Sequence, residues 1–160
     1  MTKDALLSLF STLAKVVQFF VEDTDFNIKS LSSIPDWLAQ VSQLHQQSIL
    51  EINYIFCSDN YLLKINQEYL SHDYYTDIIT FDHRDEISQP IESDVFISVD
   101  RVADNADDLN IPFFNELLRV IVHGLLHLLG FPDSSDQEKE TIRSKEDEHL
   151  TLYFKQFHQL

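Results

Sequence analysis

The chain has 160 residues, 44% of them hydrophobic, which is enough to bury one core in a single domain. Its formal net charge of −16 disfavours strong binding to naked nucleic acid, because such binding normally depends on Lys and Arg. The one cysteine, Cys57, excludes an internal disulfide, and the two glycines, Gly124 and Gly130, are too few for a glycine-rich phosphate loop.

Residues 1–15 are predicted to form a helical N-terminal extension. The apolar run after Asp4 resembles the core of a signal peptide, but Asp4 accompanies Lys3 and no small-residue cleavage site follows. Lys15 interrupts the run before the ~20 residues that span a bilayer, so no membrane association is expected. Residues 16–160 are predicted to form one metallohydrolase domain, in the cytoplasm.

Beyond this extension the chain alternates between predicted strands and helices. Four runs rich in β-branched and aromatic residues predict strands, over residues 16–21, 51–57, 76–81 and 94–99. Ser33 and Pro35 predict a helix that begins with Ser33 as N-cap and ends near Gln46. Asp59 is predicted to cap a short helix after the second strand.

A buried central helix is predicted from Asn115, as its N-cap, to Gly130. The residues between them are apolar nearly all round, and Gly130 suits a left-handed helix end. A long amphipathic helix is predicted from about Ser135. The whole pattern predicts an α+β fold, with one mixed four-stranded sheet flanked by helices and the buried central helix carrying a metal motif.

Two histidines on the central helix predict this metal site. His123 and His127 lie at i and i+4, roughly 5–6 Å apart between Cβ atoms on one helical face, so both can bind one ion. Asp133 follows the helix end and can return as a third ligand. Two histidines at this spacing also occur by chance, and such a pair can be a hydrogen-bonded part of the core. The surrounding leucines and Asp133 favour a metal site instead. Gly124 stands where a metalloprotease has its glutamate, which disfavours peptide hydrolysis.

The motif resembles the signature of the YbeY family of rRNA maturation endoribonucleases, usually His-Gly-x-Leu-His-Leu-x-Gly-Tyr-Asp-His. Three upstream blocks resemble the family in the same order, at residues 65–69, 75–81 and 93–98, and the likeness covers roughly residues 16–155. The resemblance implies a metal-dependent, single-strand-specific endoribonuclease that acts in rRNA maturation, at the 3′ end of small-subunit rRNA, and in ribosome quality control.

The resemblance also implies one divalent ion, Zn²⁺, held by His123, His127 and Asp133 beside an open position for water. Such an ion lowers the pKa of the water from about 15.7 towards ~7 and polarises a phosphoryl oxygen. Two residues depart from the family. Asp133 replaces its third histidine, and a carboxylate is an acceptable zinc ligand. Leu70 replaces an arginine that could bind a phosphate. The general base, and whether water or a ribose 2′-hydroxyl attacks, stay open.

Few cations lie near these blocks. Lys64, Arg84 and His72 are the predicted contacts to substrate phosphate, although His72 equally fits an ordinary surface histidine. Asp77 and Asp94 match family blocks, and structural hydrogen bonding explains them better than catalysis. The acidic charge implies weak affinity for free RNA. The expected partners are therefore rRNA within a ribosomal subunit, or ribosomal proteins, with no nucleotide cofactor.

Two other functions stay open from the sequence. One is a non-catalytic ribosome-assembly factor with a structural metal, whose closed four-ligand site would add Asp136 or Glu138. The other is a hydrolase of a small phosphorylated or amide substrate, which the poor electrostatic fit to RNA favours.

Overall fold

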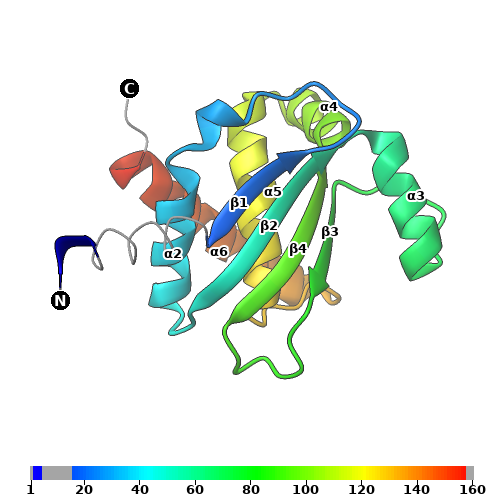
Figure 1. The fold of residues 1–160 in the computed structure, drawn as a ribbon. Helices are drawn as coiled ribbons and strands as arrows, with labels where there is room; N and C mark the ends of the chain where they lie inside the picture. The colour runs from blue at the N-terminus through cyan, green and yellow to red at the C-terminus, as the bar shows by residue number, and fades with distance from the viewer. Residues whose placement is uncertain (1, 5–15, 158–160) are drawn as a thin grey trace.

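A computed structural model of the chain describes residues 2–4 and 16–157 (Figure 1). Within them lies one sheet, made of β1 (Val17–Val21), β2 (Ile49–Cys57), β3 (Ile78–Asp82) and β4 (Ile91–Ser98). The strand order is β1-β2-β4-β3; β1, β2 and β4 are parallel, and β3 is antiparallel to β4. The predicted mixed four-stranded sheet is confirmed.

Helices surround this sheet, and the ribbon places α2, α5 and α6 on one of its faces (Figure 1). The described helices are η1 (Ile28–Leu31), α2 (Ile34–Leu44), α3 (Asp59–Leu70), α4 (Val99–Leu109), α5 (Phe113–Leu128) and α6 (Asp136–Gln156). Helix α4 was not predicted, because its acidic residues 104–108 suggested a solvated turn or helix face. It is an amphipathic helix whose Val99, Val102 and Ala106 are buried.

Helix α5 is the central element, as the sequence predicted. Its apolar side chains, among them Leu118, Ile121 and Leu125, are fully buried in the main core. Gly124 lets α5 approach the sheet closely, since an added Cβ would lie 2.8 Å from the Cδ1 atom of Ile78 on β3. The motif helix is therefore held directly against β3.

Two of the three predicted helix caps are wrong. Ser58, and not Asp59, caps α3, because its side chain accepts a hydrogen bond from the Tyr61 amide. Ser33 is the N-cap residue of α2, as predicted, but its side chain makes no capping hydrogen bond and instead hydrogen-bonds the Tyr153 hydroxyl at 2.8 Å. Helix α5 begins two residues before Asn115, directly after the extended residue Pro112, which is its N-cap.

Both ends of the loop after α5 agree with the sequence. Gly130 has φ +99°, a conformation that residues with a side chain rarely adopt. Ser135 and Glu138 form a reciprocal capping box at the start of α6. The loop that carries Asp133 is thus anchored at each end by a specific backbone signal.

Of the predicted extension 1–15, residues 1 and 5–15 lie outside the described residues, so its helical form stays a prediction. No single described helix has the length and apolar character needed to cross a membrane. Helices α4 and α5 pass that criterion only as a pair, bent by 118°, and most of α5 is buried in the core.

Candidate metal centre

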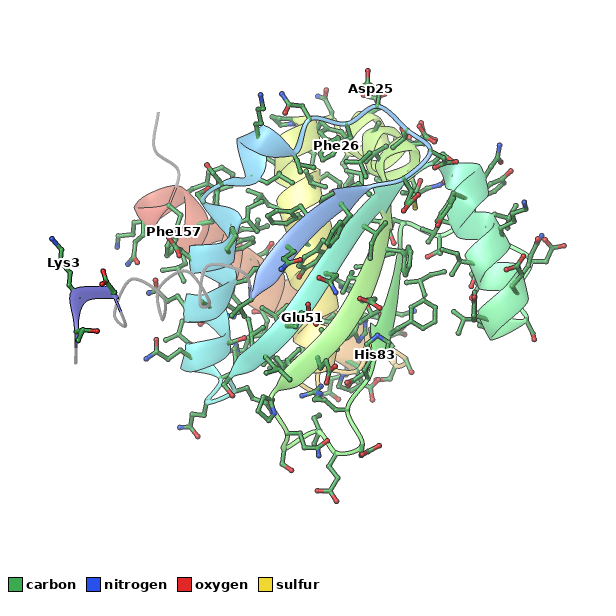
Figure 2. The ribbon with its side chains drawn as sticks, in the orientation of Figure 1. Lys3, Asp25, Phe26, Glu51, His83 and Phe157 are labelled. Atoms are coloured by element: carbon green, nitrogen blue, oxygen red, sulfur yellow. The ribbon has the colours of Figure 1, made fainter. Side chains whose placement is uncertain are left out.

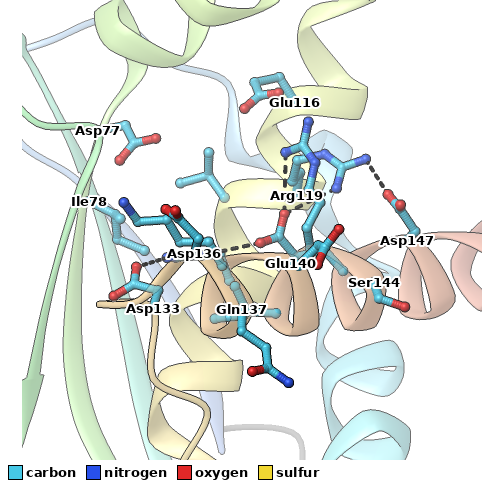
Figure 3. Close-up of a pocket in the computed structure, with 16 residues that line it drawn as sticks. Asp77, Ile78, Glu116, Arg119, Asp133, Asp136, Gln137, Glu140, Ser144 and Asp147 are labelled. Atoms are coloured by element: carbon cyan, nitrogen blue, oxygen red, sulfur yellow. Dashed lines mark hydrogen bonds and ion pairs between the residues drawn. The ribbon is translucent and has the colours of Figure 1, made fainter.

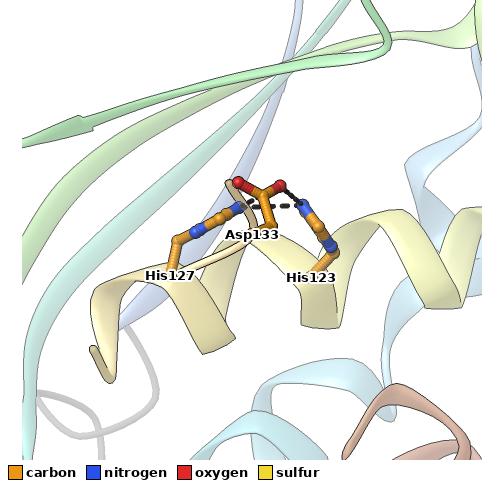
Figure 4. Close-up of side chains that lie close together, drawn as sticks. All are labelled: His123, His127 and Asp133. Atoms are coloured by element: carbon orange, nitrogen blue, oxygen red, sulfur yellow. Dashed lines mark hydrogen bonds and ion pairs between the residues drawn. The ribbon is translucent and has the colours of Figure 1, made fainter. Parts of the chain in front are cut away.

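The side chains of His123, His127 and Asp133 converge beside the C-terminal half of α5 (Figure 4). The two Nε2 atoms are 2.9 Å apart. The Asp133 Oδ2 atom lies 3.2 Å from Nε2 of His127 and 3.6 Å from Nε2 of His123. The helix supplies two ligand atoms on one face, and the turn at Gly130 brings back the third.

These distances fit a tetrahedral zinc site. Bonds of about 2.0–2.1 Å place tetrahedral ligand atoms about 3.3 Å apart, close to all three separations. In the part of the chain that the structure describes, no fourth His, Cys, Asp or Glu joins the group. Glu138 is instead bonded to the amides of Ser134 and Ser135. Three protein ligands with one open side are typical of a catalytic zinc site, whereas structural sites have four.

Glu146 on α6 orients His123 from behind. Its Oε2 atom accepts a hydrogen bond from Nδ1 of His123 at 2.9 Å, which leaves the Nε2 lone pair for the ion. Burial alone would lower the pKa of His123, but the Glu146 and Asp133 carboxylates outweigh burial and raise that pKa. The Glu146 side chain is only 5% exposed, and Arg119 donates to its other oxygen at 3.0 Å.

Glu146 was not predicted as a site residue, because the charged run at residues 145–148 is typical of a solvated helix face. Burial alone would raise the pKa of Glu146, but hydrogen bonds from His123 and Arg119 overcome burial and lower it. Helical spacing could have revealed this residue. Glu146 stands four residues after the buried Ile142 and four before the buried Leu150, on the face of α6 that packs inward.

Two cavities meet at the cluster. The larger, of about 1210 Å³, extends between α5 and α6, and the smaller, of about 480 Å³, extends along β3. Both are lined by Asp77, Ile78, His123 and Asp133. Figure 3 shows the larger cavity, with Asp77 on the strand side and Arg119 on the helix side. The cluster therefore opens onto space on two sides.

A family model described as Endoribonuclease YbeY matches residues 18–153. The chain belongs to the YbeY endoribonuclease family. A relative named Endoribonuclease YbeY from Cytophaga hutchinsonii is 50% identical over 86% of this chain and 96% of its own. Another with that name, from Flavobacterium psychrophilum, is 48% identical over 84% of this chain and 94% of its own. The resemblance found in the sequence is confirmed.

A solution structure of a Thermotoga maritima protein shares the fold, with a TM-score of 0.58. It is 21% identical to this chain, and the match covers 87% of this chain and 90% of that one. The predicted α+β fold class is thereby confirmed.

Leu70, which stands where the resemblance places an arginine, lies beside the cluster. It is the last residue of α3 and lines the smaller cavity together with His72, His123 and His127. An arginine here would add a positive charge to the lining of this cavity. None of the described residues that line this cavity is Lys or Arg.

The prediction that Arg84 contacts substrate phosphate is wrong. Its side chain is 2% exposed, and its guanidinium donates to the Asp82 carboxylate through Nε and Nη2. The remaining N–H groups bond protein oxygens, including the carbonyl of Leu128 at 2.6 Å. All five donors are engaged, so Arg84 braces the β3–β4 loop against the end of α5.

Lys64 and His72 remain predicted contacts to substrate phosphate, and they line different cavities. Lys64 is exposed and lines a separate hollow between α3 and the sheet, with Tyr69 and His83. His72 lines the smaller cavity of the cluster, and its ring stacks on Tyr74 with centroids 5.1 Å apart. Of the two, only His72 shares a cavity with the metal ligands.

Asp77 and Asp94 also differ in position. Asp94 is hydrogen-bonded to Asn53 and to His83, which is labelled in Figure 2, as a structural role requires. Asp77 lines both cavities of the cluster and accepts a hydrogen bond from Asn105 at 3.3 Å. Burial raises the pKa of Asp77.

Proposed function

We propose that this chain is a metal-dependent endoribonuclease that hydrolyses single-stranded RNA. Its place in the cell would be rRNA maturation, at the 3′ end of small-subunit rRNA, and ribosome quality control in the cytoplasm. One observation carries the proposal: three candidate ligand atoms from His123, His127 and Asp133 converge beside two cavities, in a chain from the YbeY endoribonuclease family.

Each residue of the centre has a role in this proposal. His123, His127 and Asp133 would hold one divalent ion, with Zn²⁺ favoured by the nitrogen and oxygen donors. Bound there, the ion would lower the pKa of a water molecule and polarise a phosphoryl oxygen. Glu146 keeps the proton of His123 on Nδ1, so the imidazole presents its Nε2 lone pair. Asp133 lowers the net charge of the centre relative to a third neutral histidine.

The charge of the chain supports a substrate that is held by a larger assembly. With a net charge of −16, the protein cannot gather many phosphates by itself. A ribosomal subunit, or its proteins, would supply the contacts that this chain lacks and deliver the rRNA end to the centre. The proposed partners are therefore rRNA and ribosomal components.

A second candidate function is hydrolysis of a small phosphorylated substrate. The smaller cavity favours it, because no Lys or Arg is among the described residues that line it. A small substrate needs fewer phosphate contacts than a polymer does. The open three-ligand geometry speaks against the third reading, a purely structural metal, which would be closed by a fourth ligand.

Parallel cleavage assays separate these candidates. The zinc-loaded protein is incubated with single-stranded RNA, with the same sequence as a duplex, and with a small phosphodiester such as bis-p-nitrophenyl phosphate. The proposal expects cleavage of the single strand, with at least tenfold slower turnover of the other two. Turnover of the small ester alone would favour the second candidate, and no turnover of any substrate would contradict both.

A further inference from the structure

Beyond the metal centre, the larger cavity between α5 and α6 is lined by several carboxylates together with Arg119, Lys139 and Arg143 (Figure 3). Glu116 lines it from the first turn of α5, and Asp77 lines it from the strand side. His123 and Asp133 line the same cavity. A molecule bound at the metal centre could therefore extend to Glu116 without leaving this space.

Glu116 is a buried carboxyl group with an unused acceptor. The residue is 5% exposed, and its Oε2 atom is buried with no hydrogen-bond partner in the described structure. The nearest cation along the helix, Arg119, donates instead to Glu146 and Asp147, at 3.0 and 2.8 Å. A buried acceptor without a donor carries an uncompensated desolvation cost. Burial also raises the pKa of Glu116.

A second metal ion does not explain Glu116. Among the residues that the structure describes, the one group of three His, Cys, Asp or Glu ligand atoms close enough to hold an ion is His123, His127 and Asp133. An organic group that brings its own N–H donors matches the unused acceptor of Glu116.

The position of Glu116 suits a nucleobase. It precedes His123 by seven residues, so the two share one face of α5 about 10.5 Å apart along its axis. That separation is comparable to the span from a phosphate to the hydrogen-bonding edge of its own base. The cavity, of about 1210 Å³, has room for one nucleotide, since small-ligand pockets typically measure about 300–1,000 Å³.

We propose that this cavity is a nucleobase subsite in which Glu116 accepts a hydrogen bond from the exocyclic amine of a base beside the scissile phosphate. The inference rests on the proposed function and adds a base preference to it. Unpaired bases expose their Watson–Crick edges, and carboxylates accept from amines such as cytosine N4. Cytosine is favoured over uracil, which presents a carbonyl oxygen in place of that amine.

Nucleotide binding tests the subsite without requiring catalysis. The zinc-loaded protein is titrated with cytidine 5′-monophosphate and with uridine 5′-monophosphate, and backbone amide shifts of α5 and α6 are followed by NMR. We expect cytidine monophosphate to bind about five-fold or more tightly, as one base-specific contact provides. In Glu116→Gln the ratio of the two affinities should approach one, because the amide offers a hydrogen-bond donor to uracil as well as an acceptor to cytosine.

Glu140→Gln is the matched control. Glu140 lines the same cavity but is exposed, and its substitution removes the same charge. The ratio of the affinities for cytidine and uridine monophosphate should stay as in wild type. This result would separate a specific contact of Glu116 from a general change of charge. Should Glu116→Gln fail to fold, Glu116→Asp withdraws the carboxylate by one methylene and should also lower the ratio.

Equal binding of the two nucleotides by wild type would overturn the subsite, as would an unchanged ratio in Glu116→Gln. Absence of shifts in α5 and α6 with either nucleotide would mean a cavity that holds only water, and would also overturn it. Cleavage is scored separately, on single-stranded RNAs that carry one cytidine or one uridine at the cut. A protein that prefers cytidine monophosphate but cleaves no RNA would contradict the proposed function and leave the subsite intact.

Discussion

Asp133 is the residue by which this centre differs from a site made of three histidines. Its Oδ2 atom lies 3.2 Å from His127 Nε2, close enough for the carboxylate to serve as the third ligand in place of an imidazole. We expect Asp133→Ala to weaken zinc binding at least tenfold and Asp133→His to retain it, because imidazole and carboxylate are both acceptable zinc ligands. Competition with a chromophoric chelator measures both affinities. Wild-type affinity in Asp133→Ala would remove this residue from the ligand set.

Glu146 is expected to act through His123 and not on the metal itself. Glu146→Gln weakens the acceptor that holds the Nδ1 proton, and loss of such a partner typically lowers metal affinity about 10–100-fold. The same chelator competition measures the change.

Asp147→Asn is the control for Glu146, because Asp147 also pairs with Arg119 but its side chain is 60% exposed. The Asp147 variant should bind zinc as wild type does. Equal loss in both variants would show that Arg119, and not the Glu146–His123 bond, carries the effect.

Glu116 should limit stability at neutral pH. Burial raises its pKa in the folded protein, so the folded state holds the proton more strongly than the unfolded state does. The resulting stabilisation is present below the unfolded pKa of about 4.3 and is lost as pH rises through the folded pKa. Glu116→Gln removes this titration, so the melting temperature of the variant relative to wild type should rise between about pH 4 and pH 7.

Differential scanning calorimetry at several pH values measures that trend. Glu140→Gln, which changes an exposed carboxylate of the same cavity, provides the baseline. A Glu116→Gln variant that is less stable than wild type by the same amount at every pH would indicate a structural role for the carboxyl group.

At the scale of elements, most of the correct predictions came from the spacing of apolar residues and from residues typical of turns. β-branched runs predicted all four described strands, and the apolar surface of 117–122 identified α5 as central. Helix α4 was not predicted because Asp and Asn favour turns locally, while its stabilisation comes from Val102 and Ala106 packing into the core. Val99, Val102 and Ala106 nevertheless stand at helical spacing, and this apolar pattern was the local signal for the helix.

The residues of the site also fall into two groups, those with a local sequence pattern and those without one. The i, i+4 pair and the glycine stop are local patterns, so the three candidate ligands could be proposed from the sequence. Helical spacing could place Glu146 on the inward face of α6, but its bond to His123 and the position of Glu116 in the cavity depend on how α6 and the sheet pack around α5. Arg84 was misassigned for a related reason: its nearness in sequence to a family block said nothing of the carbonyl of Leu128, which it binds.

The helix end at Gly130 can be tested directly. Its φ of +99° is costly for a residue with a Cβ, and an added Cβ would lie 3.1 Å from Ile87 Cδ1. We expect Gly130→Ala to lower the free energy of unfolding by about 1–2 kcal/mol. Gly130→Asn should lower it less, because Asn tolerates left-handed backbone better. Urea denaturation gives both values, and unchanged stability in the alanine variant would mean that the turn relaxes without cost.

At the scale of the whole molecule, the arginine side chains pair with carboxylates of this chain. Arg101 binds Asp59 at 2.6 Å, Arg119 binds Glu146 and Asp147, and Arg84 is buried. Arg143 is the more available, with its side chain 52% exposed and 3.6 Å from Glu146. Little positive surface is left to attract a polyanion, which agrees with a protein that meets its RNA on a larger assembly.

The metal centre of His123, His127 and Asp133 is expected to make this chain a metal-dependent ribonuclease. The most direct test is single-stranded RNA cleavage by the purified protein before chelation, after chelation, and after zinc is restored, with metal content measured at each step. The claim predicts about one metal per chain, loss of cleavage on chelation and its return with zinc. The His123→Ala/His127→Ala variant should neither retain metal nor cleave. Cleavage that persists in the metal-free protein or in this variant would contradict it.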